Sequence, residues 1–203
     1  MNNSLQNKTS VYLRIPKTGS TSLCRKIKPY QEILYNARDK YLGKTRYKCK
    51  NLAAATRDVL GDDLFNKMFK FSFVRNPWDR AISSWRYTSF RKRQENFKDF
   101  CEDLQYRENC GDFHSWHATE QWIHLYDVNT GKLIVDFIGR FENLQEDFDI
   151  VCDKIGIPKQ HLPHKNATKH KHYTEYYDDE TRQIVAEKYA KDIEYFGYEF
   201  GES

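Results

Sequence analysis

The sequence predicts an α/β protein of three layers, in which a central, mainly parallel sheet is flanked by helices. Two strand-like runs, 10–15 and 69–74, each lead through a polar turn into a helical run, and strands and helices continue to alternate along the chain. That alternation is typical of parallel sheets, because a helix returns the chain to the start of the next strand. The chain has 203 residues, which is close to the ~150 of one domain. We therefore expect a single domain over 1–203.

Each element follows from local periodicity and from its stop signals. Apolar residues at i, i+3, i+4 and i+7 predict helices, and alternation predicts strands. Pro77 suits the first turn of a helix, where its missing N–H costs little, and Gly156 is a typical helix stop. In chain order we expect a strand over 10–15, a helix to about 27, a helix over 51–68, a strand over 69–74, a helix from 77 to about 94, a helix over 96–108, strands over 122–126 and 133–138 joined by a glycine-containing loop, and helices over 142–155 and 178–195.

Composition favours a folded protein outside the membrane. Aromatic residues make up 15% of the chain, while there are 9 Gly and 5 Pro, so we expect a core rich in large rings rather than a disordered chain. No run approaches the ~18 apolar residues of a membrane span, and the first 30 residues lack the apolar segment of a signal peptide. The five cysteines include no C-x-x-C pair, and we expect them to be reduced thiols.

The charge of the chain is unevenly distributed. The net charge is +4, but residues 1–50 hold twelve Lys and Arg against two acidic residues, a balance of +10, and the remaining residues sum to −6. We expect the basic quarter to face an anion. A nucleotide, a sulfated or carboxylated substrate and a nucleic-acid backbone are all compatible with this charge.

The first junction, Ile15-Pro-Lys-Thr-Gly-Ser-Thr-Ser-Leu23, has the composition of a phosphate cradle. Gly19 permits a tight turn, the helix start offers free N–H groups, and Lys17 adds a positive charge beside several hydroxyl groups. In a Walker A motif the lysine would follow a second glycine, whereas here it precedes the glycine. An ordinary capped helix with a solvated lysine is the alternative that spacing alone leaves open.

The second junction, Phe73-Val-Arg-Asn-Pro-Trp-Asp-Arg-Ala-Ile-Ser83, places a guanidinium and a hydroxyl after a strand. Arg75 leaves the strand end, and Ser83 lies about two helical turns further on, so the pair is able to hold a second anion. Two anion sites at neighbouring strand ends suit a nucleotide with two separate phosphates. The alternative is that Arg75 pairs with Asp79 and that Ser83 is a surface hydroxyl.

Together the two junctions resemble the cofactor-binding signatures of sulfotransferases that use 3′-phosphoadenosine 5′-phosphosulfate (PAPS). Pro16 to Ser22 resembles the 5′-phosphosulfate loop, and Arg75 with Ser83 resembles the 3′-phosphate motif. The resemblance is greatest to carbohydrate sulfotransferases of the heparan 2-O, chondroitin and HNK-1 type and to their small microbial and viral relatives. It continues through 137–144 and 176–200, and therefore spans most of the chain.

This resemblance implies a P-loop-like fold and an in-line transfer of a sulfuryl group from PAPS to an acceptor hydroxyl. Adenosine 3′,5′-bisphosphate would leave as the product, and no metal is required. Lys17 would stabilise the charge that develops on the bridging oxygen, while Arg75 and Ser83 would hold the 3′-phosphate. Asn166 and Lys169 lie in a loop that resembles the segment closing over the nucleotide. The 5′-phosphate would be held by the backbone amides and hydroxyls of Thr18, Gly19, Ser20, Thr21 and Ser22, and the resemblance makes Pro16 and Lys17 cofactor-binding residues of the same loop.

The base that takes the proton of the acceptor hydroxyl is where the chain departs from these relatives. Many of them place a histidine between the two motifs, but this chain has none from Lys17 to Arg75, and the matching position holds Asn51. Our first candidate is His117, in a His-Ala-Thr-Glu-Gln run similar to a segment of the family. The alternatives are His114 and Glu32.

The same resemblance shapes what we expect of partners and location. The acceptor is expected to be a glycan or a small molecule, with neither nucleic acid nor a membrane as a partner. The signal anchor and luminal stem of animal Golgi relatives are missing, so we expect a soluble, cytoplasmic protein from a bacterium or from the host cell of a virus. The histidines at 161, 164, 170 and 172 fit no standard zinc spacing, and we expect no metal site.

Two other functions remain open on the residues alone. A small-molecule kinase shares the strand–loop–helix cradle, although the chain lacks a Walker A lysine and an obvious acidic strand end for Mg²⁺. A nucleic-acid-binding module would explain the basic character and the interleaved Tyr and Arg residues. The chain contains no known RNA- or DNA-binding motif.

Overall fold

A computed structural model describes residues 10–30, 52–92, 96–106, 117–127, 130–162 and 171–202. Within them, three parallel strands form one sheet in the order β1 (Ser10–Leu13), β2 (Phe69–Val74) and β3 (Phe137–Arg140). The expected α/β class with a parallel sheet is therefore confirmed. The helices are α1 (Ser20–Ile27), α3 (Leu52–Leu60), α4 (Asp62–Lys67), α5 (Pro77–Lys92), α6 (Phe97–Tyr106), α8 (Leu144–Ile155), α9 (Asp179–Lys188) and α10 (Ala190–Phe196), with 3₁₀ turns η2 (Lys28–Tyr30), η6 (Trp122–His124) and η7 (Tyr173–Tyr176).

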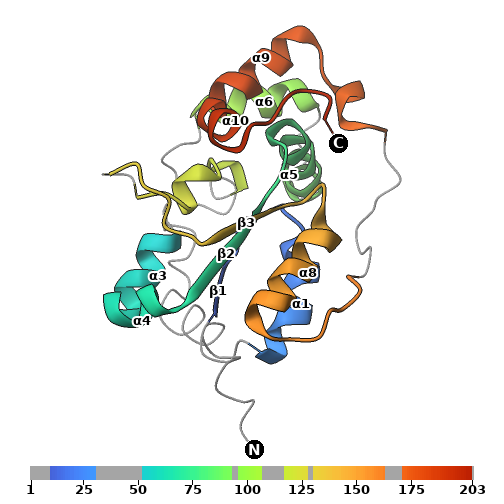
Figure 1. Cartoon of the computed structure of the whole chain (residues 1–203). Coiled ribbons are helices and arrows are strands. Elements are labelled where there is room, and N and C mark those ends of the chain that lie inside the picture. The colour runs from blue at the N-terminus through green and yellow to red at the C-terminus, as the bar shows by residue number, and fades with distance from the viewer. Residues whose placement is uncertain are drawn as a thin grey trace, which may run out of the picture.

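Helices cover both faces of the sheet (Figure 1). α1 and α8 lie on one face, where Leu23, Phe71 and Phe148 belong to one buried cluster. α3 lies on the other face, where Leu13 and Leu52 belong to a second cluster. A third cluster joins α5, α6 and α9 beyond the carboxyl edge of the sheet. The two strand-to-helix corners therefore lie between the sheet and this helical cap.

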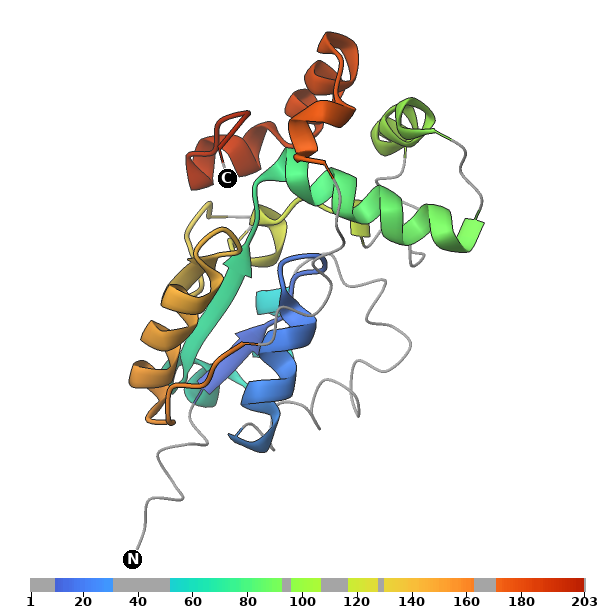
Figure 2. The same ribbon diagram turned by 90° about the vertical axis from the view of Figure 1, so that its right-hand side faces the viewer.

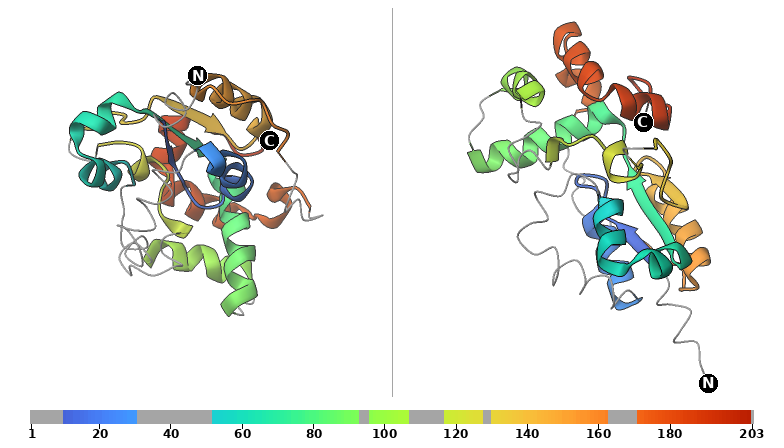
Figure 3. Two further views of the ribbon diagram at one scale, coloured as in Figure 1. Left: turned by 90° about the horizontal axis from the view of Figure 1, so that it is seen from below. Right: turned by 90° about the vertical axis from the view of Figure 1, so that its left-hand side faces the viewer.

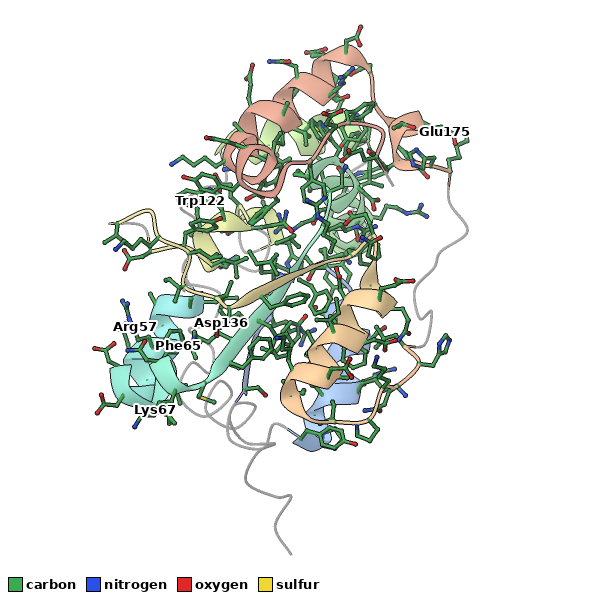
Figure 4. All side chains as sticks on the ribbon, viewed as in Figure 1. Arg57, Phe65, Lys67, Trp122, Asp136 and Glu175 are labelled. Atoms are coloured by element: carbon green, nitrogen blue, oxygen red, sulfur yellow. The ribbon has the colours of Figure 1, made fainter. Side chains whose placement is uncertain are left out.

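β2 is the central strand, and its residues from Lys70 to Val74 are all buried. Burial on both faces is usual for a parallel sheet that is covered by helices. Lys70 forms an ion pair with Asp136 at 2.9 Å, and the Ser72 hydroxyl donates to the carbonyl of Leu13 at 2.7 Å. Asp136 is labelled in Figure 4, where it lies beside β2. These bonds allow polar residues in the middle of the core.

Gly139 allows β3 to lie close to β2 at the end where both strands lead to the candidate site. Phe73 and Gly139 are partners in the register of the two strands. A Cβ atom at position 139 would lie 2.4 Å from the ring of Phe73. The missing side chain therefore makes room for the phenylalanine ring in the cluster beneath α1 and α8.

The segment that we expected to form a strand over 122–126 is a turn instead. It begins with η6, and an isolated antiparallel bridge between Tyr126 and Leu133 forms in place of the two expected strands. The next strand begins later than expected, as β3. The cause is a buried carboxylate, because Asp192 in α10 accepts the main-chain N–H groups of Gln121 and Trp122 at 2.9 and 2.8 Å. These bonds hold the segment against α10, and Figure 4 shows the labelled Trp122 close to that helix.

Two helices that we expected to be continuous are each divided in two. The helix over 51–68 is α3 and α4, which are separated at Gly61, where φ is +78°. The helix over 178–195 is α9 and α10, divided at Tyr189, whose buried hydroxyl donates to the carbonyl of Ala118. The other expected helices are present with small shifts at their ends. No helix in the described part of the chain is long and apolar enough to cross a membrane.

Candidate functional site

An arginine stands at the carboxyl end of each strand. Arg14 follows β1, Arg75 follows β2, and Arg140 is the last residue of β3. Parallel strands end at the same edge of a sheet, and ligands of open α/β sheets bind outside this edge. Figure 2 shows that the loop between β1 and α1 lies at this edge and that α5 passes across it. The edge therefore favours an anionic ligand.

The loop between β1 and α1 turns at two residues with left-handed backbone. Lys17 has a φ of +70° and Gly19 a φ of +73°. The buried hydroxyl of Thr18 donates to the carbonyl of Ile15 at 3.0 Å and closes the turn from inside. A Cβ atom on Gly19 would lie 2.8 Å from Leu144 in α8. Lys17 is the only described non-glycine residue with a positive φ, and such strain is typical of functional loops.

The first turn of α1 has no side-chain cap. The carbonyl of Gly19 accepts the N–H groups of Ser22 and Leu23 at 3.0 and 3.3 Å, but glycine offers no side chain to the preceding N–H groups, and the turn contains no acidic residue. The Nε of Arg14 donates to the hydroxyl of Ser20 at 3.1 Å. Free N–H groups, the helix dipole and this nearby arginine suit a phosphate or sulfate group.

Arg75 joins the second corner to the first. Its Nη1 donates to the carbonyl of Lys17 at 3.1 Å. Its Nε and Nη2 both contact one carboxylate oxygen of Asp79, at 2.8 and 2.7 Å, and the guanidinium lies 3.9 Å from the centroid of the Phe141 ring. A guanidinium has five N–H groups, so two are left for an anion. The pairing of Arg75 with Asp79, considered above as an alternative, is therefore present together with the contact to Lys17.

The ammonium group of Lys17 lies in electropositive surroundings. Its Nζ is 4.2 Å from the centroid of the Tyr87 ring. Burial lowers the pKa of Lys17 to about 8, and the positive charges of Arg75 and Arg80 add to this effect. No carboxylate in the described residues contributes to the pKa of this lysine. A negative charge on a bound ligand would therefore meet an ammonium that no described acid neutralises.

Arg80 fastens the first loop to the turn that carries His117. Its Nε donates to the carbonyl of Pro16 at 3.2 Å, and its Nη2 donates to the carbonyls of His117 and Thr119 at 3.3 and 2.8 Å. Only 1% of the residue is exposed, and its Nη1 has no hydrogen-bond partner among the described residues. Because burial of a guanidinium is costly, its bonds to these three carbonyls require the two loops to keep their relative position.

Further bonds to carbonyl groups hold the His117 turn against its surroundings. The hydroxyl of Ser84 in α5 donates to the carbonyl of His117 at 3.3 Å. The hydroxyl of Tyr189, between α9 and α10, donates to the carbonyl of Ala118 at 2.9 Å. Because these bonds involve main-chain oxygens, they fix the turn without using the imidazole of His117.

His117 and Lys17 contact the same aromatic ring. The centroids of the His117 and Tyr87 rings are 5.2 Å apart, and the Lys17 ammonium lies over the Tyr87 ring. His117 is buried. Figures 2 and 3 both show the short turn that contains it beside α5 and near the first loop. The proposed base and the proposed cation are therefore brought to one place.

Gln121 fixes the main chain at Arg75. Its Oε1 accepts the N–H of Arg75 and its Nε2 donates to the carbonyl of Arg75, both at 2.9 Å. Its own N–H donates to Asp192 in α10. Burial raises the pKa of the Asp192 carboxyl to about 6. Through Gln121 and Asp192, these hydrogen bonds connect the corner after β2 to α10.

The structure brings the expected residues of both corners to one edge. The loop over 16–22 touches Arg75 through Lys17, and His117 reaches the same region. Ser83 lies two turns into α5, is half buried, and has no hydrogen-bond partner among the described residues. The residues that lie outside the described part of the chain are Asn166, Lys169, the alternative bases His114 and Glu32, Asn51, and the loop histidines His164 and His170.

Cysteines and potential metal ligands are dispersed in the described part of the chain. Cys24, Cys101 and Cys152 are free thiols, whereas Cys49 and Cys110 lie outside the described residues. No group of three His, Cys, Asp or Glu side chains among the described residues is placed to hold a metal ion.

Sequence reasoning did not assign Tyr87 or Arg80 to the site. Both lie in α5 and share one helix face with Ser84, because positions 80, 84 and 87 are separated by four and three residues. This spacing was a usable signal once the helix start was placed at Pro77. The sequence does not indicate what that helix face contacts, since this depends on where the first loop and the turn that carries His117 pack.

The comparisons with known proteins include one match that covers both corners and the turn that carries His117. The chain matches a family model described as the sulfotransferase family over residues 6–199. It is similar to an uncharacterized protein of Archaeoglobus fulgidus, with 35% identity over 104 residues, which is 51% of this chain and 81% of that protein. No solved structure matches the chain significantly.

Proposed function

Since the chain belongs to the sulfotransferase family, we propose that it moves a sulfuryl group from PAPS to the hydroxyl of a carbohydrate acceptor. The transfer is an in-line displacement that releases adenosine 3′,5′-bisphosphate. The resemblance of both corners to carbohydrate sulfotransferases supports the choice of donor and acceptor. Arg14 and Arg75, at the ends of β1 and β2, support a ligand with several negative charges, whereas the guanidinium of Arg140 donates to the carbonyl of Phe196 and lies over the Tyr198 ring.

The observation that carries this proposal is the bond from Arg75 Nη1 to the carbonyl of Lys17, at 3.1 Å. It joins the two strand-to-helix corners, which are far apart in the sequence and which we propose to bind one phosphate each. One nucleotide with a phosphate on each side of its ribose would use both corners at once. A ligand with a single phosphate group would leave one of them without a role.

Each corner has a distinct task in the proposal. The uncapped first turn of α1, with its N–H groups and the hydroxyls of Ser20 and Thr21, holds the 5′-phosphate. The two remaining N–H groups of Arg75 and the hydroxyl of Ser83 hold the 3′-phosphate. Asn166 and Lys169 are proposed as further contacts to the nucleotide.

The chemical step forms one bond to sulfur and breaks another. The acceptor oxygen attacks the sulfur, and the bond between sulfur and the bridging oxygen of the 5′-phosphate breaks, so that this oxygen takes the electron pair. The ammonium of Lys17 stabilises the resulting charge. His117 takes the proton of the attacking hydroxyl as a general base. The positive charge that the step needs comes from Lys17, Arg75 and the helix N-terminus.

A binding experiment tests the proposal through the 3′-phosphate. We expect Arg75→Ala to weaken the binding of adenosine 3′,5′-bisphosphate by about 100-fold, because charge-assisted bonds to phosphate are lost, and to weaken that of adenosine 5′-phosphate only slightly. Isothermal titration calorimetry measures both affinities, with Arg182→Ala as the matched control. Equal losses for the two nucleotides would remove the role of Arg75 and the main support for PAPS.

A transfer experiment identifies the acceptor class. Radiolabelled PAPS is incubated with the protein and with sugars, glycan fragments, a tyrosine peptide and simple alcohols, and the labelled products are separated. We expect transfer to a carbohydrate hydroxyl. Transfer confined to tyrosine or to an alcohol would correct the acceptor and leave the donor in place, whereas no transfer to any class would contradict the proposed reaction.

A further inference from the structure

Tyr87 contacts both of the groups to which the proposed reaction assigns chemistry. The Nζ of Lys17 is 4.2 Å from the centroid of its ring, and the ring of His117 is centred 5.2 Å away at an interplanar angle of 34°. Tyr87 is 37% exposed. Burial in the core is therefore not sufficient to explain its position.

The Lys17 ammonium faces repulsion from the other charged groups around it. Arg75, at the start of the second corner, and Arg80, on α5, both act on it with positive charge. Asp79, at the second corner, forms an ion pair with Arg75 at 2.7 Å, and no described acid contributes to the pKa of Lys17. The His117 ring packs against the same Tyr87 ring, with the two ring centroids 5.2 Å apart.

An aromatic face attracts a cation because the quadrupole of the ring makes that face negative. Among the described residues, the Tyr87 ring attracts the Lys17 ammonium, whereas Arg75 and Arg80 repel it. The main chain of Lys17 is constrained by the left-handed turn. The attraction to the ring in addition restricts the position of the ammonium at the end of the flexible side chain. Position and charge of the ammonium therefore both depend on this ring.

We propose that Tyr87 is a positioning residue, whose ring face keeps the Lys17 ammonium charged and in the place where the leaving oxygen needs it. The proposal rests on the proposed function for its catalytic consequence. Its electrostatic part concerns the protein alone. The two parts can therefore be tested separately.

The first test measures Lys17 without any nucleotide. Competitive labelling of amines with acetic anhydride across a range of pH, read by mass spectrometry, gives the pKa of Lys17. We expect Tyr87→Leu, which keeps apolar volume but removes the ring, to lower this pKa by about 0.5. We expect Tyr87→Phe, which keeps the ring, to leave it near the native value of about 8.

The second test measures transfer from PAPS as a function of pH. Because Lys17 must be protonated, kcat falls as pH rises through its pKa, and Tyr87→Leu should move this fall to lower pH by the shift found in the labelling test. At pH 7 Lys17 stays mostly protonated in both proteins. We expect kcat to drop several-fold there because the ammonium is displaced from the leaving oxygen, while KM for PAPS changes less, since Lys17 acts on the transition state. Tyr87→Phe should restore both values.

Tyr195→Leu is the matched control, because Tyr195 is 38% exposed and packs against Trp122 and Tyr126, away from Lys17. It should change neither the pKa of Lys17 nor the pH profile. The proposal is overturned if Tyr87→Leu leaves the pKa of Lys17 unchanged, or if Tyr87→Phe behaves like Tyr87→Leu. If the native protein does not use PAPS while the labelling result holds, the proposed function fails and the electrostatic role of Tyr87 stands.

Discussion

Arg80 donates a hydrogen bond from its Nε to the carbonyl of Pro16 at 3.2 Å, so a fully buried guanidinium in α5 holds the loop that precedes α1. The same side chain donates to the carbonyls of His117 and Thr119. One residue therefore sets the distance between the loop that would hold the donor and the turn that would carry the base. It does so through main-chain oxygens of both segments and not through their side chains.

Replacing Arg80 with lysine tests this arrangement. A lysine keeps the charge but has no planar fork to reach carbonyls on two loops. We expect Arg80→Lys to lower the free energy of unfolding by about 2–4 kcal/mol and to lower kcat beyond what the unfolded fraction explains. Urea denaturation and kinetics at low temperature measure the two effects. Arg182→Lys is the control, and native kcat in Arg80→Lys would show that the link is not needed for turnover.

Two substitutions of Lys17 separate the effect of its ammonium on sulfuryl transfer from the effect of its backbone strain on stability. Lys17→Ala and Lys17→Gly both remove the ammonium, and we expect each to reduce sulfuryl transfer by about 100-fold or more while binding of the bisphosphate product is largely kept. Because φ at this position is +70°, the glycine variant should be the more stable of the two by about 1 kcal/mol. Thermal melting measures this difference, and equal stabilities would mean that the left-handed turn is not strained.

His117 is expected to matter for turnover and not for nucleotide binding. General base catalysis contributes about 100-fold or more, so His117→Ala should lower kcat by at least that factor with unchanged affinity for adenosine 3′,5′-bisphosphate. The exposed His161 gives a matched control in His161→Ala. Near-normal turnover in His117→Ala would move the role of base to another group, and we would then test Glu32.

The buried carboxyl of Asp192 should make the stability of the protein depend on pH. Burial raises its pKa from the ordinary 3.8 to about 6, so the folded protein binds this proton more tightly than the unfolded chain does. The stability that this tighter proton binding adds to the folded protein is fully present below the pKa of the unfolded chain, 3.8. It is lost as the pH rises through about 6. Relative to Asp192→Asn, the native protein should lose up to about 3 kcal/mol between pH 4 and pH 7. Urea denaturation at both pH values measures this, with Glu194→Gln as the control, and a difference that does not change with pH would contradict the raised pKa.

Local signals were sufficient for both strand-to-helix corners. The run over 10–15, the turn at Gly19, the alternation over 69–74 and the proline at 77 each concern residues within a few positions of one another, and the structure contains the corresponding elements. The same holds for α8, whose apolar spacing and final glycine predicted its extent well. The adjacency of two parallel strands then brought the corners to one edge.

Local signals predicted the wrong element where a residue far away in the sequence forms hydrogen bonds with the segment. The segment over 122–126 has the composition of a strand, but Asp192 binds its first N–H groups and makes it a turn. The final helix is interrupted at Tyr189, which bonds to the turn after His117. In both cases the partner is many residues away, and nothing in the local pattern indicates it.

The sequence by itself determined the alternation of strands and helices, the two corners and the residue types within them, because turn chemistry and periodicity act between neighbours in the chain. Only the tertiary structure decided that Lys17 meets Tyr87, that Arg80 binds both loops, and that Gln121 supports Arg75. Contacts of this second kind form when whole elements pack. Their partners are selected by the shape of the folded chain rather than by spacing along it.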